Sequence, residues 1–424
     1  MSAARIIVSH PSKQGNMYRV PAAANRAGFD TTFLTGLYWR RAPWAEAVLR
    51  SLPTRLREPI GAALERRRLA DLDPAAVRMV SGPLPELAYR SLGYRVGNAI
   101  HDRLVAAWLR RHVAKGSVGV FHGFQEACAR SLVAAEERGL FSLLEVTLPP
   151  STAAVVAAEH RRLGLPVAGP TGPAPDMLRE LASARYVVVQ SRFSAASVMA
   201  HGVEPGRIFL MPLGVDAERF RPAAARTATS APPASRSFRA LFTGQMTVRK
   251  GVHLLLEAWA RVAGPEDELL FAGYPADPFI QERVAHAPGG RRRYLGFVPH
   301  ERLHEVYRQA DIFVFPSLAE GGVYVIYEAL ASGLPCIVSE NAGSAVRDGV
   351  EGFVVPAGDV DALADRIRRL KEDEALRRRM ALAAHARGEA MSWPNFYRRG
   401  GLMYREILRR DGATGEGVFD LFER

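Results

Sequence analysis

Two glutamates and a pair of cations are the residues of this chain whose types and spacing could do chemistry. Glu320 and Glu328 lie eight positions apart, and Arg249 and Lys250 stand next to each other earlier in the chain. Carboxylates accept hydrogen bonds from hydroxyl groups, whereas an arginine fork and a lysine point charge suit the oxygens of a diphosphate. Taken alone, the glutamate spacing also fits a surface loop followed by a solvated helix.

The stretch that holds the two glutamates is predicted to form a strand, a glycine turn, a helix and a second strand. Residues 312–315 are an apolar run, too short for a helix, as in a strand buried on both faces. Gly321 and Gly322 form the turn, residues 324–332 suit a helix, and residues 336–338 suit a strand. Backbone N–H groups and the helix dipole make such a turn an anion site.

Arg249 and Lys250 belong to another predicted strand-to-helix turn. The strand at 239–244 ends in Gly244, and a helix is expected over 252–262. The turn does not have the spacing of a Walker phosphate-binding loop. A diphosphate would suit these two cations, and a solvated pair at a helix start is the structural alternative.

Length and composition indicate an ordinary globular protein. The 424 residues suffice for two or three domains, and 48% of them are hydrophobic and 24% charged. No stretch has the apolar length of a membrane helix, and the N-terminus lacks the regions of a signal peptide. Two cysteines argue against a disulfide framework, and no Cys/His cluster suggests zinc. We therefore expect a cytoplasmic protein.

The net charge of +12 comes almost entirely from arginine, and residues 40–68 concentrate it beside Trp39 and Trp44. An enzyme that handles nucleotide diphosphates, an anionic membrane surface or a nucleic acid would each suit such charge. No recognised nucleic-acid motif accompanies it, and arginines on solvated faces are the plain explanation. We expect no nucleic acid, and we hypothesise a peripheral contact with anionic membrane through this segment.

The N-terminal half opens as a strand, helix and strand over 5–9, 18–27 and 31–34, with Gly15 in the first loop. Open α/β sheets bind ligands at the carboxyl ends of their strands. Residues 118–122 are predicted to form another strand, with His122 at its carboxyl end. Prolines divide residues 38–115 into short helices, and no long amphipathic helix is predicted there.

The stretch with the two glutamates resembles the signature region of retaining glycosyltransferases of family 4, which have the GT-B fold. The matching residues are Pro316, Ser317, Glu320, Gly321, Glu328, Ala329, Ala331, Gly333 and Pro335. The resemblance extends over most of the chain and is clearest from about residue 239 to 370. It departs at Gly322-Val323-Tyr324, where many relatives have a bulky residue and then glycine, so the donor sugar is not predicted.

The resemblance implies an α/β protein of the GT-B class, with two doubly wound Rossmann-like domains facing across a cleft. The expected parts are an acceptor-side domain over 1–220, a linker at 221–237, a nucleotide-sugar domain over 238–390, a helix at 391–410 that returns to the first domain, and a loosely held tail at 411–424. The implied activity is a retaining, metal-independent transfer of a sugar from a nucleotide-diphosphate sugar. The sugar is expected to be a hexose. The acceptor would be a glycan, a lipid-linked molecule or a small molecule in bacterial polysaccharide, glycolipid or related glycoconjugate synthesis.

The resemblance also implies a role for each candidate residue. Glu320 and His122 would be catalytic, with Glu320 at the sugar hydroxyls or the anomeric centre and His122 beside the donor sugar. Glu328 would bind the ribose. The other donor-binding residues implied are Gly15, Gly244, Arg249, Lys250, Phe297, Val298, Gly321, Gly322, Val323 and Tyr324. No metal and no cofactor are expected, and Asp359 is better explained as a helix cap than as a metal ligand.

Two other classes of protein compete with this interpretation. A pyridoxal-phosphate phosphorylase would need a Schiff-base lysine, and Lys250, the single lysine of the expected site, is assigned to phosphate. A GT-B scaffold without catalysis could instead bind nucleic acid or anionic surfaces through its basic charge.

Overall fold

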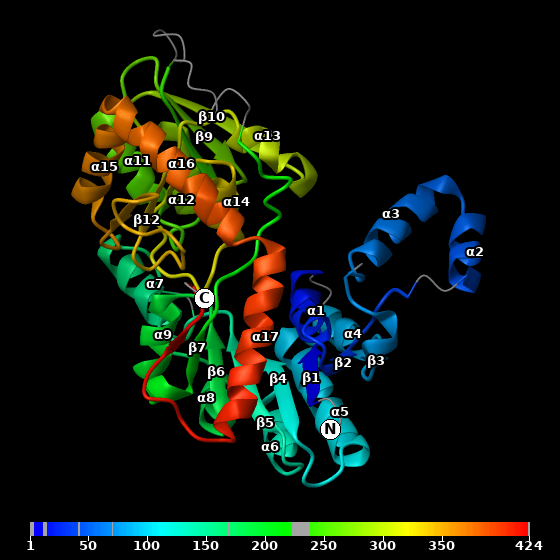
Figure 1. Cartoon of the computed structure of the whole chain (residues 1–424). Helices are drawn as coiled ribbons and strands as arrows, with labels where there is room; N and C mark the ends of the chain where they lie inside the picture. Colours follow the sequence, from blue (N-terminus) through cyan, green and yellow to red (C-terminus); the bar gives the residue numbers. More distant parts are fainter. Residues whose placement is uncertain are drawn as a thin grey trace.

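The computed structural model describes residues 4–11, 15–40, 43–69, 71–167, 169–222 and 237–422, and it contains two parallel β-sheets, each covered by helices (Figure 1). The first sheet has the order β14-β7-β6-β5-β4-β1-β2-β3 and the second the order β10-β9-β8-β11-β12-β13. Every pairing between named strands is parallel. This is the doubly wound α/β architecture that the sequence predicts, in two copies.

The central strands have short apolar cores, as strands covered on both faces require, whereas the edge strand β10 is largely exposed. Those of the first sheet are β1 (Arg5–His10), β2 (Asp30–Thr35), β3 (Val77–Met79), β4 (Gly119–Phe124), β5 (Phe141–Val146), β6 (Tyr186–Val189), β7 (Ile208–Leu210) and β14 (Phe419–Asp420). Those of the second are β8 (Arg239–Thr243), β9 (Glu268–Ala272), β10 (Arg291–Gly296), β11 (Ile312–Phe315), β12 (Cys336–Ser339) and β13 (Gly352–Val355).

The helices connect these strands. The first domain has η1 (Gly15–Tyr18), α1 (Arg19–Arg26), α2 (Pro43–Ser51), α3 (Thr54–Glu65), η2 (Pro74–Ala76), α4 (Leu84–Ser91), α5 (Tyr94–His112), α6 (Ala129–Glu136), α7 (Thr152–Arg162), α8 (Pro175–Ser183), α9 (Arg192–Met199) and η3 (Pro205–Arg207). The second has α11 (Val252–Val262), α12 (Pro278–His286), η4 (His300–Arg302), α13 (Leu303–Tyr307), α14 (Tyr324–Ala331), α15 (Val360–Glu372) and α16 (Glu374–Ala390), and α17 (Trp393–Arg410) follows.

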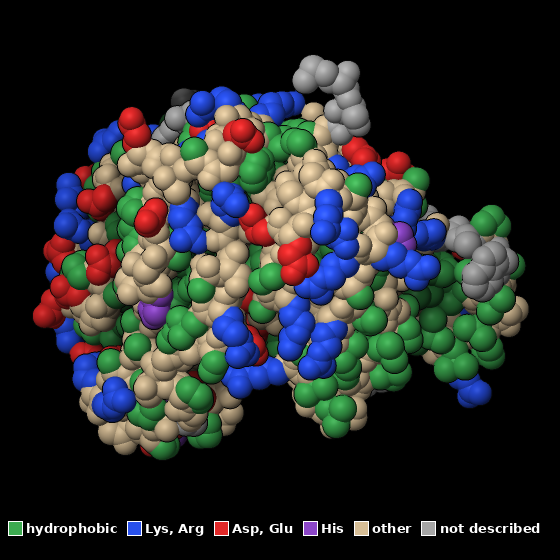
Figure 2. Space-filling model, turned by 90° about the horizontal axis from the view of Figure 1, so that it is seen from below, with side chains coloured by type: hydrophobic (Ala, Val, Ile, Leu, Met, Phe, Trp, Pro, Cys, Tyr) green, Lys and Arg blue, Asp and Glu red, His purple; other side chains and the backbone are tan. Residues whose placement is uncertain are grey.

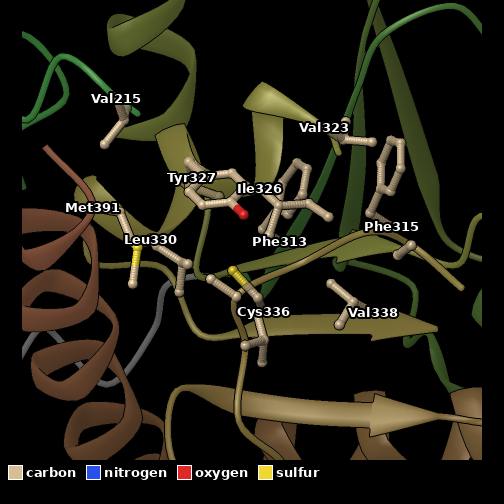
Figure 3. Close-up of a cluster of buried hydrophobic side chains, with 14 of the residues drawn as sticks. Val215, Phe313, Phe315, Val323, Ile326, Tyr327, Leu330, Cys336, Val338 and Met391 are labelled. Atoms are coloured by element: carbon tan, nitrogen blue, oxygen red, sulfur yellow. The ribbon is translucent and has the colours of Figure 1, made fainter. Parts of the chain in front are cut away.

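The predicted strand–turn–helix–strand unit is confirmed as β11, α14 and β12. Figure 3 shows side chains of all three elements in one buried cluster, among them Phe315 of β11, Leu330 of α14 and Val338 of β12. Gly333 ends α14 with φ +68°, a left-handed conformation that glycine adopts without strain. The turn with Glu320 is therefore fixed at both ends by a rigid core.

The last long helix, α17, runs back onto the first domain and lies along α1. Gly400 and Gly401 make this close approach feasible, because a Cβ at either position would lie 2.8 Å from the Cβ of Ala23 or Ala27. The aromatic side chains of α17 then enter the core of the first domain, where Tyr404 is fully buried.

Three local expectations are tested directly by the structure. The Asp359 carboxylate accepts from Ala362 N at 2.8 Å, so its prediction as the cap of α15 is confirmed. The absence of a long helix from 38–115 was wrong, because α5 has 19 residues. The loosely held tail was also wrong for residues 411–422, since β14 pairs with β7 and Leu421 is fully buried. Most of the predicted linker lies outside the described residues.

Candidate functional site

The two predicted cations and the loop glutamate meet at the carboxyl ends of β8 and β11, which are neighbours in the second sheet. Arg249 Nη1 lies 2.6 Å from Glu320 Oε2, and Lys250 Nζ lies 3.2 Å from Glu320 Oε1. The main chains are joined as well, because Leu318 N donates to Arg249 O at 2.8 Å. We call Arg249, Lys250 and Glu320 the charged cluster.

Solvent reaches the charged cluster from the side of Arg249. The exposed fractions of the side chains are 32% for Arg249, 14% for Lys250 and 10% for Glu320. Burial lowers the pKa of Lys250, and Glu320 opposes that shift. Lys250 Nζ also lies 4.9 Å from the centre of the Phe315 ring, a cation–π contact. With two cations and one carboxylate, the cluster has a net positive charge when all three groups are ionised.

Glycines allow close backbone contacts at the turn with the cations and at the turn with Glu320. Gly251 has φ +68°, and a Cβ there would lie 2.0 Å from Pro316 O. A Cβ at Gly321 would lie 2.0 Å from Thr147 O of the first domain, and Ser194 Oγ donates to Gly321 O at 3.3 Å. The glycine turn after Glu320 therefore lies against the first domain, at the junction of the two sheets.

The second predicted glutamate, Glu328, has different partners. Its Oε2 accepts from the Tyr307 hydroxyl at 2.9 Å, and its Oε1 lies 2.9 Å from His300 Nε2. Tyr307 is fully buried and Glu328 is 4% exposed, whereas the His300 side chain is 55% exposed. The hydrogen bond to Glu328 raises the pKa of His300. One oxygen of Glu328 is thus held from inside the protein, and the other meets a residue that solvent reaches.

His122 lies inside the first domain rather than at the end of its strand, so that expectation was wrong. The strand continues to Phe124, and His122 pairs with Leu143 of β5 in mid-sheet. Its Nδ1 lies 2.8 Å from the Tyr404 hydroxyl, and its Nε2 lies 3.1 Å from Glu145 Oε2. Gln190 Nε2 donates to Glu145 Oε1 at 2.9 Å. We call His122, Glu145, Gln190 and Tyr404 the buried polar cluster.

A cavity of about 110 Å³ adjoins the buried polar cluster. Apolar side chains such as Met17, Met211 and Phe396 line most of it, and Gly322 and Tyr324 reach it from the glycine turn of the second domain. Burial raises the pKa of Tyr324. The cavity therefore connects His122 with two of the residues predicted at the donor site.

The remaining predicted residues lie around the turns of the second domain. Phe297, after β10, is 78% exposed, and the neighbouring Val298 packs against the core. Gly244 faces Lys250, and Val323 is buried directly before α14. Gly15 begins η1. The structure thus brings Arg249, Lys250 and Glu320 into contact, while Glu328 and His122 have other partners.

Sequence reasoning missed His300, Tyr307, Glu145 and Tyr404. Glu145 carried a usable signal, because a carboxylate inside an otherwise apolar strand needs a buried partner. Tyr404 contacts His122 across 282 positions of the chain, and no local pattern indicates such a contact.

Neither a cluster of metal-ligating side chains nor a membrane-spanning helix is found among the described residues. They contain no group of three or more His, Cys, Asp or Glu side chains that could hold a metal ion. No helix in that part of the chain is both long and apolar enough to cross a membrane.

Comparison with protein families and curated proteins finds a match to most of the second domain. Residues 237–373 match the family described as glycosyl transferases group 1. A D-inositol 3-phosphate glycosyltransferase of Nocardia farcinica is 31% identical over 246 residues, which cover 52% of this chain and 54% of that protein. The amylovoran biosynthesis glycosyltransferase AmsK of Erwinia amylovora is 30% identical over 227 residues, covering 50% and 55%. The chain spans about half the length of the curated relatives it matches.

Solved structures match over nearly the whole chain. Sucrose-phosphate synthase from Thermosynechococcus elongatus has a TM-score of 0.62 at 20% identity and covers 96% of this chain and 99% of its own. Anabaena Alr3699/HepE in complex with UDP and glucose has a TM-score of 0.60 at 15% identity, covering 95% and 100%. The two sheets therefore have the GT-B arrangement, and residues 237–373 are similar to the group 1 glycosyl transferases.

Proposed function

We propose that this protein is a retaining, metal-independent glycosyltransferase that moves a sugar from a nucleotide-diphosphate sugar to an acceptor. The observation that carries the proposal is the charged cluster at the carboxyl edge of a group 1 glycosyltransferase domain. A positive group at this place, beside a helix N-terminus, suits a nucleotide diphosphate.

The charged cluster also suggests how the donor is received. A diphosphate has more negative charge than the Glu320 carboxylate. Its oxygens would therefore replace that carboxylate as the hydrogen-bonding partners of Arg249 and Lys250. The carboxylate of Glu320 would then be free to accept from hydroxyls of the donor sugar. As the bond to the sugar breaks, the two cations and the amides around Gly321–Val323 would stabilise the departing diphosphate.

Glu328 suits the ribose. Tyr307 holds one of its oxygens in place, and the oxygen at His300 is the one that ribose hydroxyls would meet. Phe297 and Val298, in the turn after β10, would lie beside the base, and Gly15 and Gly244 would line the phosphates. His122 lines the cavity that Gly322 and Tyr324 also reach, which supports a place near the donor sugar.

The names of similar proteins support a proposal for the donor and the acceptor. The HepE structures contain UDP and UDP-glucose, and the matching curated proteins are named for transfer to inositol phosphate and for amylovoran synthesis. We infer a hexose as the transferred sugar and a glycan, lipid-linked or small-molecule acceptor in bacterial polysaccharide, glycolipid or related glycoconjugate synthesis. We further infer a cytoplasmic protein that works at the inner face of the cell membrane.

A panel of nucleotide sugars tests this proposal. The purified protein should be stabilised against heat by some members and should hydrolyse or transfer their sugar in the presence of a metal chelator. NMR of the new glycosidic bond should show the anomeric configuration of the donor. Polynucleotide binding without turnover of any nucleotide sugar would instead favour a non-catalytic GT-B scaffold.

A further inference from the structure

The helices α2 and α3 form a hairpin that stands off the first domain. The hairpin lies between β2 and β3 in the chain, so it leaves the sheet at the edge opposite β14. In Figure 1 it extends away from the rest of the molecule, at the right of the view. In α3 no residue is buried, and α2 and α3 chiefly contact each other.

The hairpin presents large apolar side chains to solvent. Val48 is 56% exposed, Leu56 46% and Ile60 40%. Leu56 and Ile60 are four positions apart in α3 and thus lie on one face of that helix. Of the 19 exposed large hydrophobic residues in the described part of the chain, nine fall between Val48 and Val96; three of these lie on the hairpin and six follow it in the chain. Figure 2 shows hydrophobic side chains gathered over the protruding region. Such a concentration indicates an interaction surface.

Arginines accompany these apolar side chains. Arg50, Arg55 and Arg57 are exposed on the hairpin, and the Arg50 side chain is 74% exposed. Glu46 pairs with Arg50 at 3.3 Å. Arg67 and Arg68, by contrast, lie half-buried at the base of the hairpin, where Arg67 O accepts from Trp39 N. The outer part of the hairpin therefore combines apolar side chains with Arg50, Arg55 and Arg57.

We propose that the hairpin docks on an anionic lipid bilayer. Val48, Leu56 and Ile60 enter the headgroup region, and Arg50, Arg55 and Arg57 contact lipid phosphates from the flanks. A nucleic acid would satisfy the arginines but leave the apolar side chains in water, whereas the bilayer interface accepts both. The helices lie along the interface, because α3 has 12 residues and Pro59 within it. The inference rests on the proposed function only in expecting a membrane-bound acceptor nearby.

Vesicle co-sedimentation tests whether the hairpin binds an anionic bilayer. The protein should bind vesicles of phosphatidylcholine with phosphatidylglycerol and stay in the supernatant with phosphatidylcholine alone. Added salt should weaken the binding. Replacing Arg50, Arg55 and Arg57 together by Ala should lower the partition coefficient on the order of a hundredfold. Leu56→Ser with Ile60→Ser should lower it about tenfold without changing the charge.

Matched variants in the second domain serve as controls. Leu382 of α16 is 62% exposed, so Leu382→Ser removes a comparable apolar side chain away from the hairpin. Arg368, Arg378 and Arg379, all exposed, replaced together by Ala, remove the same charge. Both controls should bind like the unchanged protein. The proposal is overturned if the protein stays in the supernatant with anionic vesicles at low salt, or if the controls lose as much binding as the hairpin variants. Nucleotide-sugar turnover in solution should be unchanged in the hairpin variants, so this result stands apart from the proposed activity.

Discussion

The two sheets share a topology but place their polar groups differently. In the second sheet Arg249, Lys250 and Glu320 gather at the carboxyl ends of the strands, and Arg249 is 32% exposed. In the first sheet His122 is 1% exposed, and its partners Glu145 and Tyr404 come from β5 and α17. A parallel sheet thus offers a ligand edge at both places, and at the edge of the second sheet the clustered charges lie within reach of an anion from solvent.

The difference between the two clusters has an electrostatic reason. Buried charges need partners, and the buried polar cluster fixes α17 on the first sheet through hydrogen bonds among its own members. The charged cluster has one more cation than carboxylates, so it is complete only when another anion arrives. Substitutions in the two clusters should therefore have different effects on nucleotide binding.

The largest effect is expected from the cations. Lys250→Ala and Arg249→Ala each remove a charged hydrogen-bond donor of about 1.5–3 kcal/mol, which is roughly tenfold to a hundredfold or more in affinity. Isothermal titration with a nucleoside diphosphate and with the matching nucleoside measures it. The loss should be large for the diphosphate and small for the nucleoside.

Lys371 provides the control for this loss. It is a partly buried lysine that pairs with Asp267 at 2.5 Å in the same domain, so Lys371→Ala removes an ion pair at the amino end of β9, away from the carboxyl ends of the strands. This variant should lose stability but keep its preference for the diphosphate. Equal losses for nucleoside and diphosphate in Lys250→Ala would mean that the cluster does not contact phosphate.

A somewhat smaller effect is expected from Glu320→Gln. Without the carboxylate, the cations no longer have a negative partner that competes with phosphate, so nucleoside diphosphate affinity should stay the same or increase. Turnover should fall about a hundredfold if Glu320 contacts the reacting sugar. A fall in diphosphate affinity with unchanged turnover would contradict the role given to Glu320.

Glu328→Ala should change donor affinity, whereas Glu320→Gln should chiefly change turnover. The substitution leaves the Tyr307 hydroxyl without its carboxylate and would remove the proposed hydrogen bonds to ribose, so donor affinity should fall about tenfold. A deoxynucleotide donor distinguishes a lost ribose contact from a disturbance at Tyr307. If the ribose contact is the cause, the variant and the unchanged protein should bind this donor with similar affinity. Unchanged affinity of Glu328→Ala for the ribonucleotide donor would exclude the ribose contact.

A substitution in the buried polar cluster should lower stability and turnover but leave nucleotide affinity nearly unchanged. His122→Phe leaves the Tyr404 hydroxyl without its buried partner, at a cost of about 1–3 kcal/mol in the free energy of unfolding. Nucleoside diphosphate affinity should remain within about twofold of the unchanged protein, while turnover falls about tenfold if His122 lies beside the donor sugar. Urea unfolding and calorimetric titration give both values. A loss of nucleotide affinity as large as that of Lys250→Ala would remove the distinction between the two clusters.

Local chemistry explains what could be predicted from the sequence. The helix 252–262 is found with the predicted bounds, and Asp359 caps its helix, because apolar periodicity and capping residues act over a few positions. The contact of Arg249 and Lys250 with Glu320 could be expected as well, since adjacent parallel strands bring their carboxyl ends together.

The missed features depend on contacts between distant parts of the chain. The buried face of α5 bears Asn98, His101 and Asp102, so it lacks the apolar period of an ordinary helix. His101 contacts Ser9 and Ser81, and Asp102 accepts from the N-terminus of α6. The pairing of β14 with β7 depends likewise on Arg410, which lies over the rings of Phe209 and Phe419.

The smallest expected effect is a pH dependence from His300, at the exposed side of Glu328. The hydrogen bond to Glu328 raises the pKa of His300, while partial burial and Arg219 oppose the shift and Glu301 adds to it. A raised pKa means that this contact stabilises the folded protein fully below the ordinary histidine pKa of about 6.5 and loses that effect as the pH rises through the raised value. Because the side chain is 55% exposed, solvent screening limits the contribution to less than about 1 kcal/mol. The melting temperature of the unchanged protein should exceed that of His300→Gln by a degree or two at about pH 6, and the difference should shrink towards pH 8. In a Glu328→Gln background the same His300 substitution should no longer give a stabilisation that shrinks from about pH 6 to about pH 8, and an unchanged difference there would show that Glu328 is not the main partner that raises the pKa of His300.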